Sequence, residues 1–398
     1  MTDPELRGAE LARRFFSDVV EPLLGWQMPG LRYAAARLGS GSDVLGLDDE
    51  MSRDHDWGCR LTLLVDEDAR DQVQPVSRLL QESLPERFEQ FPVRFGVTWD
   101  PSVSHQVEVA TVAGFAASRL GLGLGLDLDL DVGLDPTRGL SALDWLTITG
   151  QSVLEVTAGP VFADRTRTLA AVRALLAWYP PDVELYVLAA GWQRLCQSLP
   201  FLGRTAEAGD ELGSRLLSAR VADDLVSLAF TLSRRWAPYA KWRGTVFRSL
   251  PVAARLGPLL DHAMAAPGWR DRENALTAAC ELLLDRQRAN GLPAPASAVI
   301  PFWDRPYRTV DQAVPQRLLA GLTDPDVARL PPLVGAVEQW ADSTDVLSSP
   351  GRRAALQTAY RAWAAPPPAA ADTAASNANA NADNAAIVAD ADADADAE

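Results

Sequence analysis

Cysteine, basic clusters and long apolar runs are scarce in this chain of 398 residues. The three cysteines, Cys59, Cys196 and Cys280, form no CxxC pair and no disulfide-rich framework, which favours a reducing compartment. No apolar run approaches the length of a membrane span, and the N-terminal residues contain no apolar signal core. We therefore expect a soluble, cytoplasmic protein with no membrane partner. The abundance of Ala, Arg, Asp and Pro favours a bacterial source.

Basic residues are fewer than acidic ones, with 37 Lys and Arg against 53 Asp and Glu. The formal net charge is -16, and much of the acidic excess lies in residues 121–135 and 366–398. A large nucleic-acid footprint needs a basic face, so we expect no extensive nucleic-acid binding. A narrow basic groove remains compatible with this charge.

The hydrophobic pattern divides the chain into an α+β protein with two folded parts. Residues 1–178 alternate helical and strand patterns, which predicts an α/β domain around a short mixed sheet. Residues 179–365 are helical throughout and predict an all-α bundle. The low-complexity stretch 121–135 is expected to be a surface loop. The acidic Ala/Asn/Asp tail, 366–398, has too few apolar residues to fold and is predicted to be disordered.

Individual elements follow from the spacing of apolar residues. In the first part we expect helices over 4–24, 31–37, 70–86 and 140–146, and strands over 59–65, 95–99 and 106–112. In the second part and just before it, the predicted helices are 167–177, 183–198, 206–235, 239–249, 253–265, 270–290, 312–323 and 351–363.

Acidic residues gather before the first predicted strand. Asp54 and Asp56 are two positions apart, so on a strand both side chains would point the same way. Glu108 lies on a later strand whose apolar residues face the other way, and Glu155 is the alternative third acid. Three such carboxylates can hold Mg²⁺ against phosphate oxygens, so the pattern predicts a two-ion Mg²⁺ site. Asp48, Asp49 and Glu50 are either solvated linker or support for that site.

A glycine-serine turn precedes these acids. Gly39 and Ser40 offer backbone N–H groups and a hydroxyl to phosphate oxygens, and Ser42 adds a second hydroxyl. No Lys follows Gly46, which disfavours an ordinary P-loop NTPase.

These residues resemble the signature of the nucleotidyltransferase superfamily typified by DNA polymerase beta. Leu38-Gly39-Ser40 is followed by thirteen residues and then Asp54-His55-Asp56, and Glu108 matches the family's third carboxylate. The helical second half resembles the C-terminal domains of kanamycin and lincosamide nucleotidyltransferases. The longer pattern GSxSxxxGxDDExSRDHDWG resembles a bacterial nucleotidyltransferase-like family that carries a domain of unknown function, over about residues 15 to 350.

The resemblance implies a chemistry and two further residues. A lysine of the helical domain, here Lys241, would reach the triphosphate of ATP or another NTP. A carboxylate of that domain, with Glu207 first, would be the general base. The implied reaction transfers a nucleoside monophosphate, AMP by first choice, to a hydroxyl of a small-molecule acceptor and releases pyrophosphate. The alternatives are a protein or RNA acceptor, or a catalytically silent nucleotide-binding interaction protein.

Overall fold

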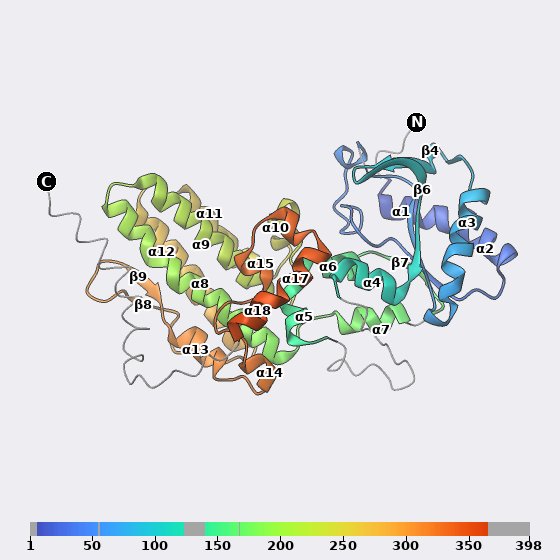
Figure 1. Cartoon of the computed structure of the whole chain (residues 1–398). Helices are drawn as coiled ribbons and strands as arrows, with labels where there is room; N and C mark the ends of the chain where they lie inside the picture. Colours follow the sequence, from blue (N-terminus) through green and yellow to red (C-terminus); the bar gives the residue numbers. More distant parts are fainter. Residues whose placement is uncertain (1–5, 55, 123–139, 167, 365–398) are drawn as a thin grey trace.

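The protein consists of two lobes joined by short helices. The computed structural model describes residues 6–54, 56–122, 140–166 and 168–364. One lobe carries the sheet and the N-terminal helices, and the other is helical (Figure 1). The α+β fold class predicted from the sequence is therefore confirmed. The acidic tail, most of the 121–135 stretch and His55 lie outside the described residues.

Within the described ranges, five strands form one mixed sheet in the order β5-β6-β2-β1-β7. β2 runs parallel to β6, and the other neighbouring pairs are antiparallel. The strands are β1 (Tyr33–Ala36), β2 (Arg60–Val65), β5 (Arg94–Val97), β6 (Asp100–Thr111) and β7 (Val161–Asp164). The predicted strands at 59–65, 95–99 and 106–112 are thus present. A small hairpin, β3 (Arg87–Phe88) with β4 (Phe91–Pro92), lies outside this sheet.

The predicted helix at 31–37 is wrong, because this segment forms the inner strand β1. Its four residues, Tyr33-Ala34-Ala35-Ala36, are buried and pair with β2 on one side and β7 on the other. Alanine favours helix in isolation. Here the small side chains let helices pack closely on both faces of the sheet, and tertiary packing outweighs intrinsic propensity.

Helices cover both faces of the sheet. One face packs against α1 (Gly8–Phe15), a π-helical turn (Phe16–Val20), α2 (Glu21–Gln27) and α3 (Val73–Ser83). The opposite face packs against α4 (Val112–Leu120), α5 (Ala142–Thr147), α6 (Gly150–Thr157) and α7 (Thr168–Leu175). The alternation of β2 explains the division, since Leu61 and Leu63 lie in the first cluster and Leu64 in the second.

Long antiparallel helices build the second lobe. The larger elements are α8 (Pro181–Glu207), α9 (Glu211–Leu232), α10 (Ala240–Phe247), α11 (Ala253–Ala265), α12 (Trp269–Ala289) and α13 (Ala313–Leu319). The hairpin β8 (Val299–Pro301) with β9 (Arg308–Val310) packs beside them. The C-terminal segment holds α14 (Pro325–Ala328), α15 (Val337–Trp340), α16 (Thr344–Leu347), α17 (Pro350–Ala355) and α18 (Gln357–Ala364).

The predicted uninterrupted helix over 206–235 is wrong at its start. α8 continues to Glu207 through Pro200, and Gly209 then takes a left-handed conformation with φ of 85°. Asp210 accepts a hydrogen bond from Gly213 N at 2.7 Å and begins α9. A glycine in this conformation followed by an acidic N-cap is a typical helix stop and restart.

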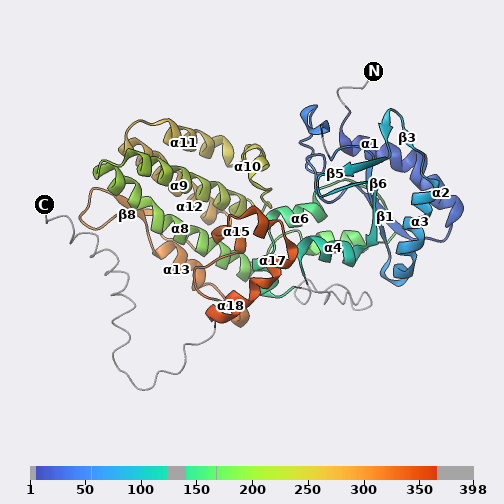
Figure 2. The ribbon, with the colours of Figure 1, turned by 45° about the horizontal axis from the view of Figure 1, so that its top comes forward.

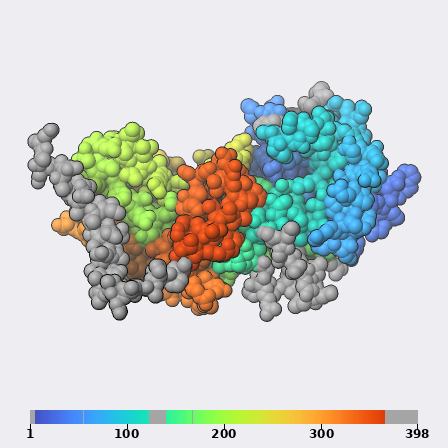
Figure 3. All heavy atoms as spheres, in the orientation of Figure 1, coloured from blue at the N-terminus to red at the C-terminus, as the bar shows by residue number. Residues whose placement is uncertain are grey.

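One apolar cluster spans the predicted boundary at residues 178 and 179. It includes Phe115 and Trp145 from the first part, and Tyr186, Trp236 and Tyr360 from the second. Trp145 and Trp236 stack with parallel rings, 6.3 Å between centroids. The C-terminal segment lies between the lobes (Figure 3). No helix in the described part of the chain is both long and apolar enough to cross a membrane.

Candidate functional site

The Gly39-Ser40 turn follows strand β1 and is held by a buried ion pair. Arg37, at the end of β1, donates to both carboxylate oxygens of Asp43, at 2.7 and 2.9 Å. The same guanidinium donates to the backbone oxygen of Ser40 at 2.8 Å. Gly39 has φ of 85°, a conformation that favours glycine. The turn is therefore fixed in shape by residues on both sides of it.

Asp54 and Asp56 are not on a strand, which corrects the prediction made from their spacing. Asp54 caps the short 3₁₀ turn Met51–Arg53, and β2 begins only at Arg60. Asp56 has φ of 55°. Its carboxylate accepts from Thr98 N at 2.6 Å and from Thr98 Oγ1 at 2.7 Å. The loop before β2 is thus tied to the tip of the β5–β6 hairpin.

Glu108 lies on β6 as predicted, with its side chain on the face opposite the buried Val107. It is directly opposite Thr62 of β2 and forms an ion pair with Arg119 of α4 at 2.5 Å. Glu155 is on helix α6 and not on a strand. Its carboxylate is 3.8 Å from Arg119 Nε, and burial raises its pKa. Both candidate third acids therefore flank one guanidinium.

Arg60 is a functional candidate that sequence reasoning missed. Its guanidinium donates to the Asp56 backbone oxygen at 3.0 Å and to Ser40 Oγ at 3.5 Å. Burial and the neighbouring Arg37 lower the pKa of Arg60 to about 9, so the group is a cation at neutral pH. The signal in the sequence was an arginine at the start of the otherwise apolar strand pattern Leu61–Val65. Arg119, at the end of an apolar helix, gave no comparable signal.

The predicted two-ion Mg²⁺ site requires convergent carboxylates. Carboxylate oxygens are suitable ligands for Mg²⁺. In this arrangement, however, Asp56 is engaged by Thr98 and Glu108 by Arg119. Across the described ranges, no group of three His, Cys, Asp or Glu side chains is placed to hold a metal ion. The two-ion Mg²⁺ site stays a prediction of the sequence.

Asp48 and Asp49 have structural roles. Asp48 is buried and accepts from Gly8 N at 2.7 Å and from Trp57 Nε1 at 3.1 Å. It therefore satisfies the N-terminus of α1. Asp49 accepts from Ser52 N at 3.0 Å and stabilises the following turn.

Helix α6 connects the Gly39-Ser40 turn to the helix that carries Lys241. The Glu155 backbone oxygen accepts from Gly39 N at 2.8 Å. One turn earlier, Gln151 Oε1 accepts from Tyr239 N at 3.3 Å, just before α10 begins at Ala240. In both ribbon views α6 and α10 lie side by side at the junction of the lobes (Figures 1 and 2). Lys241 is exposed, with Nζ 5.1 Å from the centroid of the Trp242 ring.

Glu207, the first choice for the general base on the resemblance, lies far from this region. It ends α8, where the chain turns into α9 at the end of the helical lobe remote from the sheet (Figures 1 and 2). Its carboxylate accepts a hydrogen bond from Tyr307. This position does not suit a general base acting near Gly39 and Ser40.

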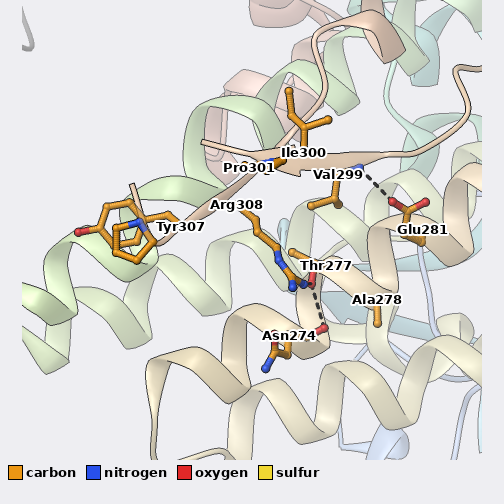
Figure 4. Close-up of a pocket in the computed structure, with 10 residues that line it drawn as sticks. Asn274, Thr277, Ala278, Glu281, Val299, Ile300, Pro301, Tyr307 and Arg308 are labelled. Atoms are coloured by element: carbon orange, nitrogen blue, oxygen red, sulfur yellow. Dashed lines mark hydrogen bonds between the residues drawn. The ribbon is translucent and has the colours of Figure 1, made fainter. Parts of the chain in front are cut away.

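A separate cavity of about 610 Å³ lies between α12 and the β8–β9 hairpin (Figure 4). Glu281 closes one side by accepting from Val299 N at 3.0 Å. Arg308 and Thr277 supply polar groups on another side. The cavity contains none of the predicted site residues.

Comparisons with known proteins match parts of the chain. A family model described as a domain of unknown function (DUF4037) matches residues 145–243, which include α6 and Lys241. The search of curated proteins found no match. Among solved structures, the chain is similar to a nucleotidyltransferase-like protein from Exiguobacterium sibiricum 255-15, with 12% identity and a TM-score of 0.29. That similarity covers 71% of this chain and 77% of the other.

Proposed function

We propose that the protein is a nucleotidyltransferase that binds ATP or another NTP at the Gly39-Ser40 turn. The observation that carries the proposal is the gathering of cationic groups around a rigid, glycine-shaped turn. Arg60 contacts Ser40, and the position of a Cβ on Gly39 would be 3.5 Å from Arg119 Nη2. Guanidinium groups suit phosphate oxygens, to which they donate charge-assisted hydrogen bonds.

Lys241 supports the same proposal from the helical lobe. It is the single lysine in a chain whose Lys and Arg together number 37, so every other permanent cation is an arginine. A lysine is a compact, mobile point charge, whereas arginine is a planar fork. Its exposed position on α10, linked through α6 to Gly39, suits a side chain that extends onto a bound triphosphate.

The proposed reaction follows from binding an NTP beside an acceptor. The acceptor hydroxyl oxygen attacks the α-phosphorus, and the bond from that phosphorus to the β-phosphate oxygen breaks. Pyrophosphate leaves, the hydroxyl proton passes to a base, and the nucleoside monophosphate remains on the acceptor. Arg60, Arg119 and Lys241 would orient the phosphates and offset their charge. A small-molecule acceptor is the first choice, and protein or RNA acceptors are the alternatives.

Transfer of label tests the proposal. The purified chain is incubated with each α-labelled NTP, with and without Mg²⁺, and with small-molecule, protein and RNA fractions of a bacterial extract. Label on a small molecule together with pyrophosphate release is the expected result. Label on protein or RNA would show that the acceptor is a macromolecule and not a small molecule. Nucleotide binding without pyrophosphate release would indicate a catalytically silent nucleotide-binding protein. Absence of NTP binding under every condition would reject the proposal.

The single lysine allows a direct test of its role. Lys241→Met should weaken ATP binding about tenfold or more, as expected for a lost charge-assisted contact. Arg248→Met, at the C-terminal end of the same helix, is the matched control and should leave affinity unchanged. ATP should also protect Lys241 from acylation, measured by peptide mass spectrometry with the N-terminal amine as internal reference. Equal acylation with and without ATP would contradict the role of Lys241.

A further inference from the structure

Trp99 is an exposed aromatic residue placed beside the proposed phosphate site. It lies with Thr98 in the two-residue turn between β5 and β6 and is 60% exposed. This hairpin is on the side of its lobe that faces the helical lobe, whereas α2 is on the remote side (Figure 2). Trp99 therefore lies on the side of this lobe toward the helices, and Trp26 lies on the remote helix α2.

The position of Trp99 is fixed by contacts on both sides. Asp56 holds the turn through both Thr98 N and Thr98 Oγ1. The Arg60 guanidinium carbon lies 5.4 Å from the centroid of the Trp99 ring. The Arg60 guanidinium therefore contacts both Ser40 Oγ and the Trp99 ring.

We propose that Trp99 is the stacking surface for the base of the bound nucleotide and makes the site favour purines. The inference rests on the proposed function, since it places the phosphates at Gly39 and Ser40. A nucleotide carries groups that match both contacts of Arg60, an anionic phosphate chain and a planar base. One face of the indole lies toward Arg60, and the large exposed fraction leaves the rest of the ring for a planar group.

Stacking explains why the preference should be for purines. A base stacked on an aromatic side chain gains affinity in proportion to overlapping ring area, with little dependence on hydrogen-bond pattern. A two-ring purine covers more of an indole than a pyrimidine does. The cation beside Trp99 adds attraction for the ring and for the nearby phosphates. The site is therefore expected to separate ATP and GTP from CTP and UTP, and to separate ATP from GTP little.

The alternative is that Trp99 merely shields Arg60 from solvent. Leucine keeps an apolar cover over the guanidinium and removes stacking, whereas phenylalanine keeps an aromatic ring. The two substitutions at position 99 therefore distinguish the roles. Trp26→Leu is the matched control, because Trp26 is 82% exposed and lies on the remote helix α2.

Isothermal titration of the full chain with ATP, CTP and inorganic tripolyphosphate tests the proposal. In Trp99→Leu, ATP affinity should fall roughly tenfold, CTP affinity should fall less, and tripolyphosphate affinity should stay the same. Trp99→Phe should retain most of the preference for ATP, and Trp26→Leu should behave as the wild type.

An equal loss of affinity for ATP and tripolyphosphate in Trp99→Leu would show a shielding role and overturn the proposal. Tripolyphosphate binding with no preference among nucleotides in the wild type would also overturn it and leave the phosphate site intact. No binding of any of the three ligands would reject the proposed function itself.

Discussion

Arg37 and Asp43 decide the shape of the Gly39-Ser40 turn at the scale of single residues. Their side chains are 2% and 5% exposed, so each charge depends on the other for solvation. Removing one partner of a buried ion pair leaves an uncompensated charge. The turn is thus sensitive to either residue although neither would contact a bound phosphate directly.

We predict that Asp43→Asn destabilises the protein by about 3–5 kcal/mol, the usual cost of breaking a buried pair. Urea unfolding followed by tryptophan fluorescence measures the change. The control is Asp326→Asn, which removes the pair with the exposed Arg329 and should cost at most about 1 kcal/mol. Similar losses of unfolding free energy in the two variants would show that the buried Arg37–Asp43 pair stabilises the fold no more than an exposed pair does.

Glu155 provides a pH-dependent prediction at the same scale. Burial raises its pKa in the folded state, with Gln151 and Arg119 acting in the opposite direction. Folding therefore favours the neutral acid. The stability that this preference contributes is fully present below the ordinary glutamate pKa, about 4.3, and is lost as pH rises through the raised folded pKa.

The expected outcome is a pH-dependent difference between the wild type and Glu155→Gln. Melting temperatures measured from about pH 2.5 to 8 should show the wild type losing stability relative to the variant as pH increases above the ordinary glutamate pKa. Asp49→Asn is the control for the opposite pH dependence, because hydrogen bonds from Ser52 lower the pKa of Asp49. The stability that the Asp49 carboxylate contributes is lost as pH falls. A difference between the wild type and Glu155→Gln that is independent of pH would contradict the prediction.

At the scale of elements, Gly209 separates α8 from α9, whereas periodicity placed the end of α8 and all of α9 in one helix over 206–235. Nothing lies within 4 Å of the position of a Cβ on Gly209, so its φ of 85° is the only obstacle to a side chain. Gly257 lies inside α11, also has open space around a Cβ, and has no positive φ. The two glycines therefore isolate backbone conformation from packing.

Gly209→Ala should destabilise the protein by about 1–2 kcal/mol, because L-residues are strained in the left-handed region. Gly257→Ala should stabilise it by about 0.5–1 kcal/mol, because alanine favours a helix interior. Denaturant unfolding of both variants gives the comparison. A continuous helix through residue 209 in solution would make both substitutions stabilising.

These elements show how far the sequence predicts the fold. The helix at 253–265 and the strand at 59–65 were correct, since apolar spacing dominates where one face is buried. The strand at Tyr33–Ala36 was missed, because alanine carries no β-pattern and only its position between β2 and β7 makes it a strand. The stop at Gly209 was missed because a glycine permits a break without requiring one.

The candidate site was predicted in part for a related reason. Glu108 lies on its strand as expected, since alternation in β6 is clear. The turn at Asp54 and Asp56 was misassigned, because an i, i+2 spacing is equally compatible with an irregular loop. Arg60 and Arg119 come together only through the parallel pairing of β2 with β6 and the packing of α4, which no local pattern encodes.

At the scale of the whole molecule, the lobes share a core instead of meeting at a polar surface. Trp145 and Tyr179 pack against Trp236, and Tyr360 is fully buried in the same cluster. Arg353, also buried, donates from Nη2 to the backbone oxygen of Arg119 at 2.8 Å and from Nε to that of Thr147 at 3.2 Å. The C-terminal segment thus supports the helix that carries Arg119.

We predict that a division at residue 178 does not yield two independently folding parts. Residues 1–178 expressed alone should aggregate or bind hydrophobic dye, because Trp145 and Trp178 would lose their contacts with Trp236 and expose a large apolar surface. Co-expressed fragments 1–178 and 179–398 should associate and co-purify, since the shared core can re-form between them. Size-exclusion chromatography and thermal unfolding distinguish the outcomes. A monomeric 1–178 fragment with its own cooperative unfolding transition would contradict this prediction. It would show that each part folds independently and that the shared apolar cluster is only an interface between two folded domains.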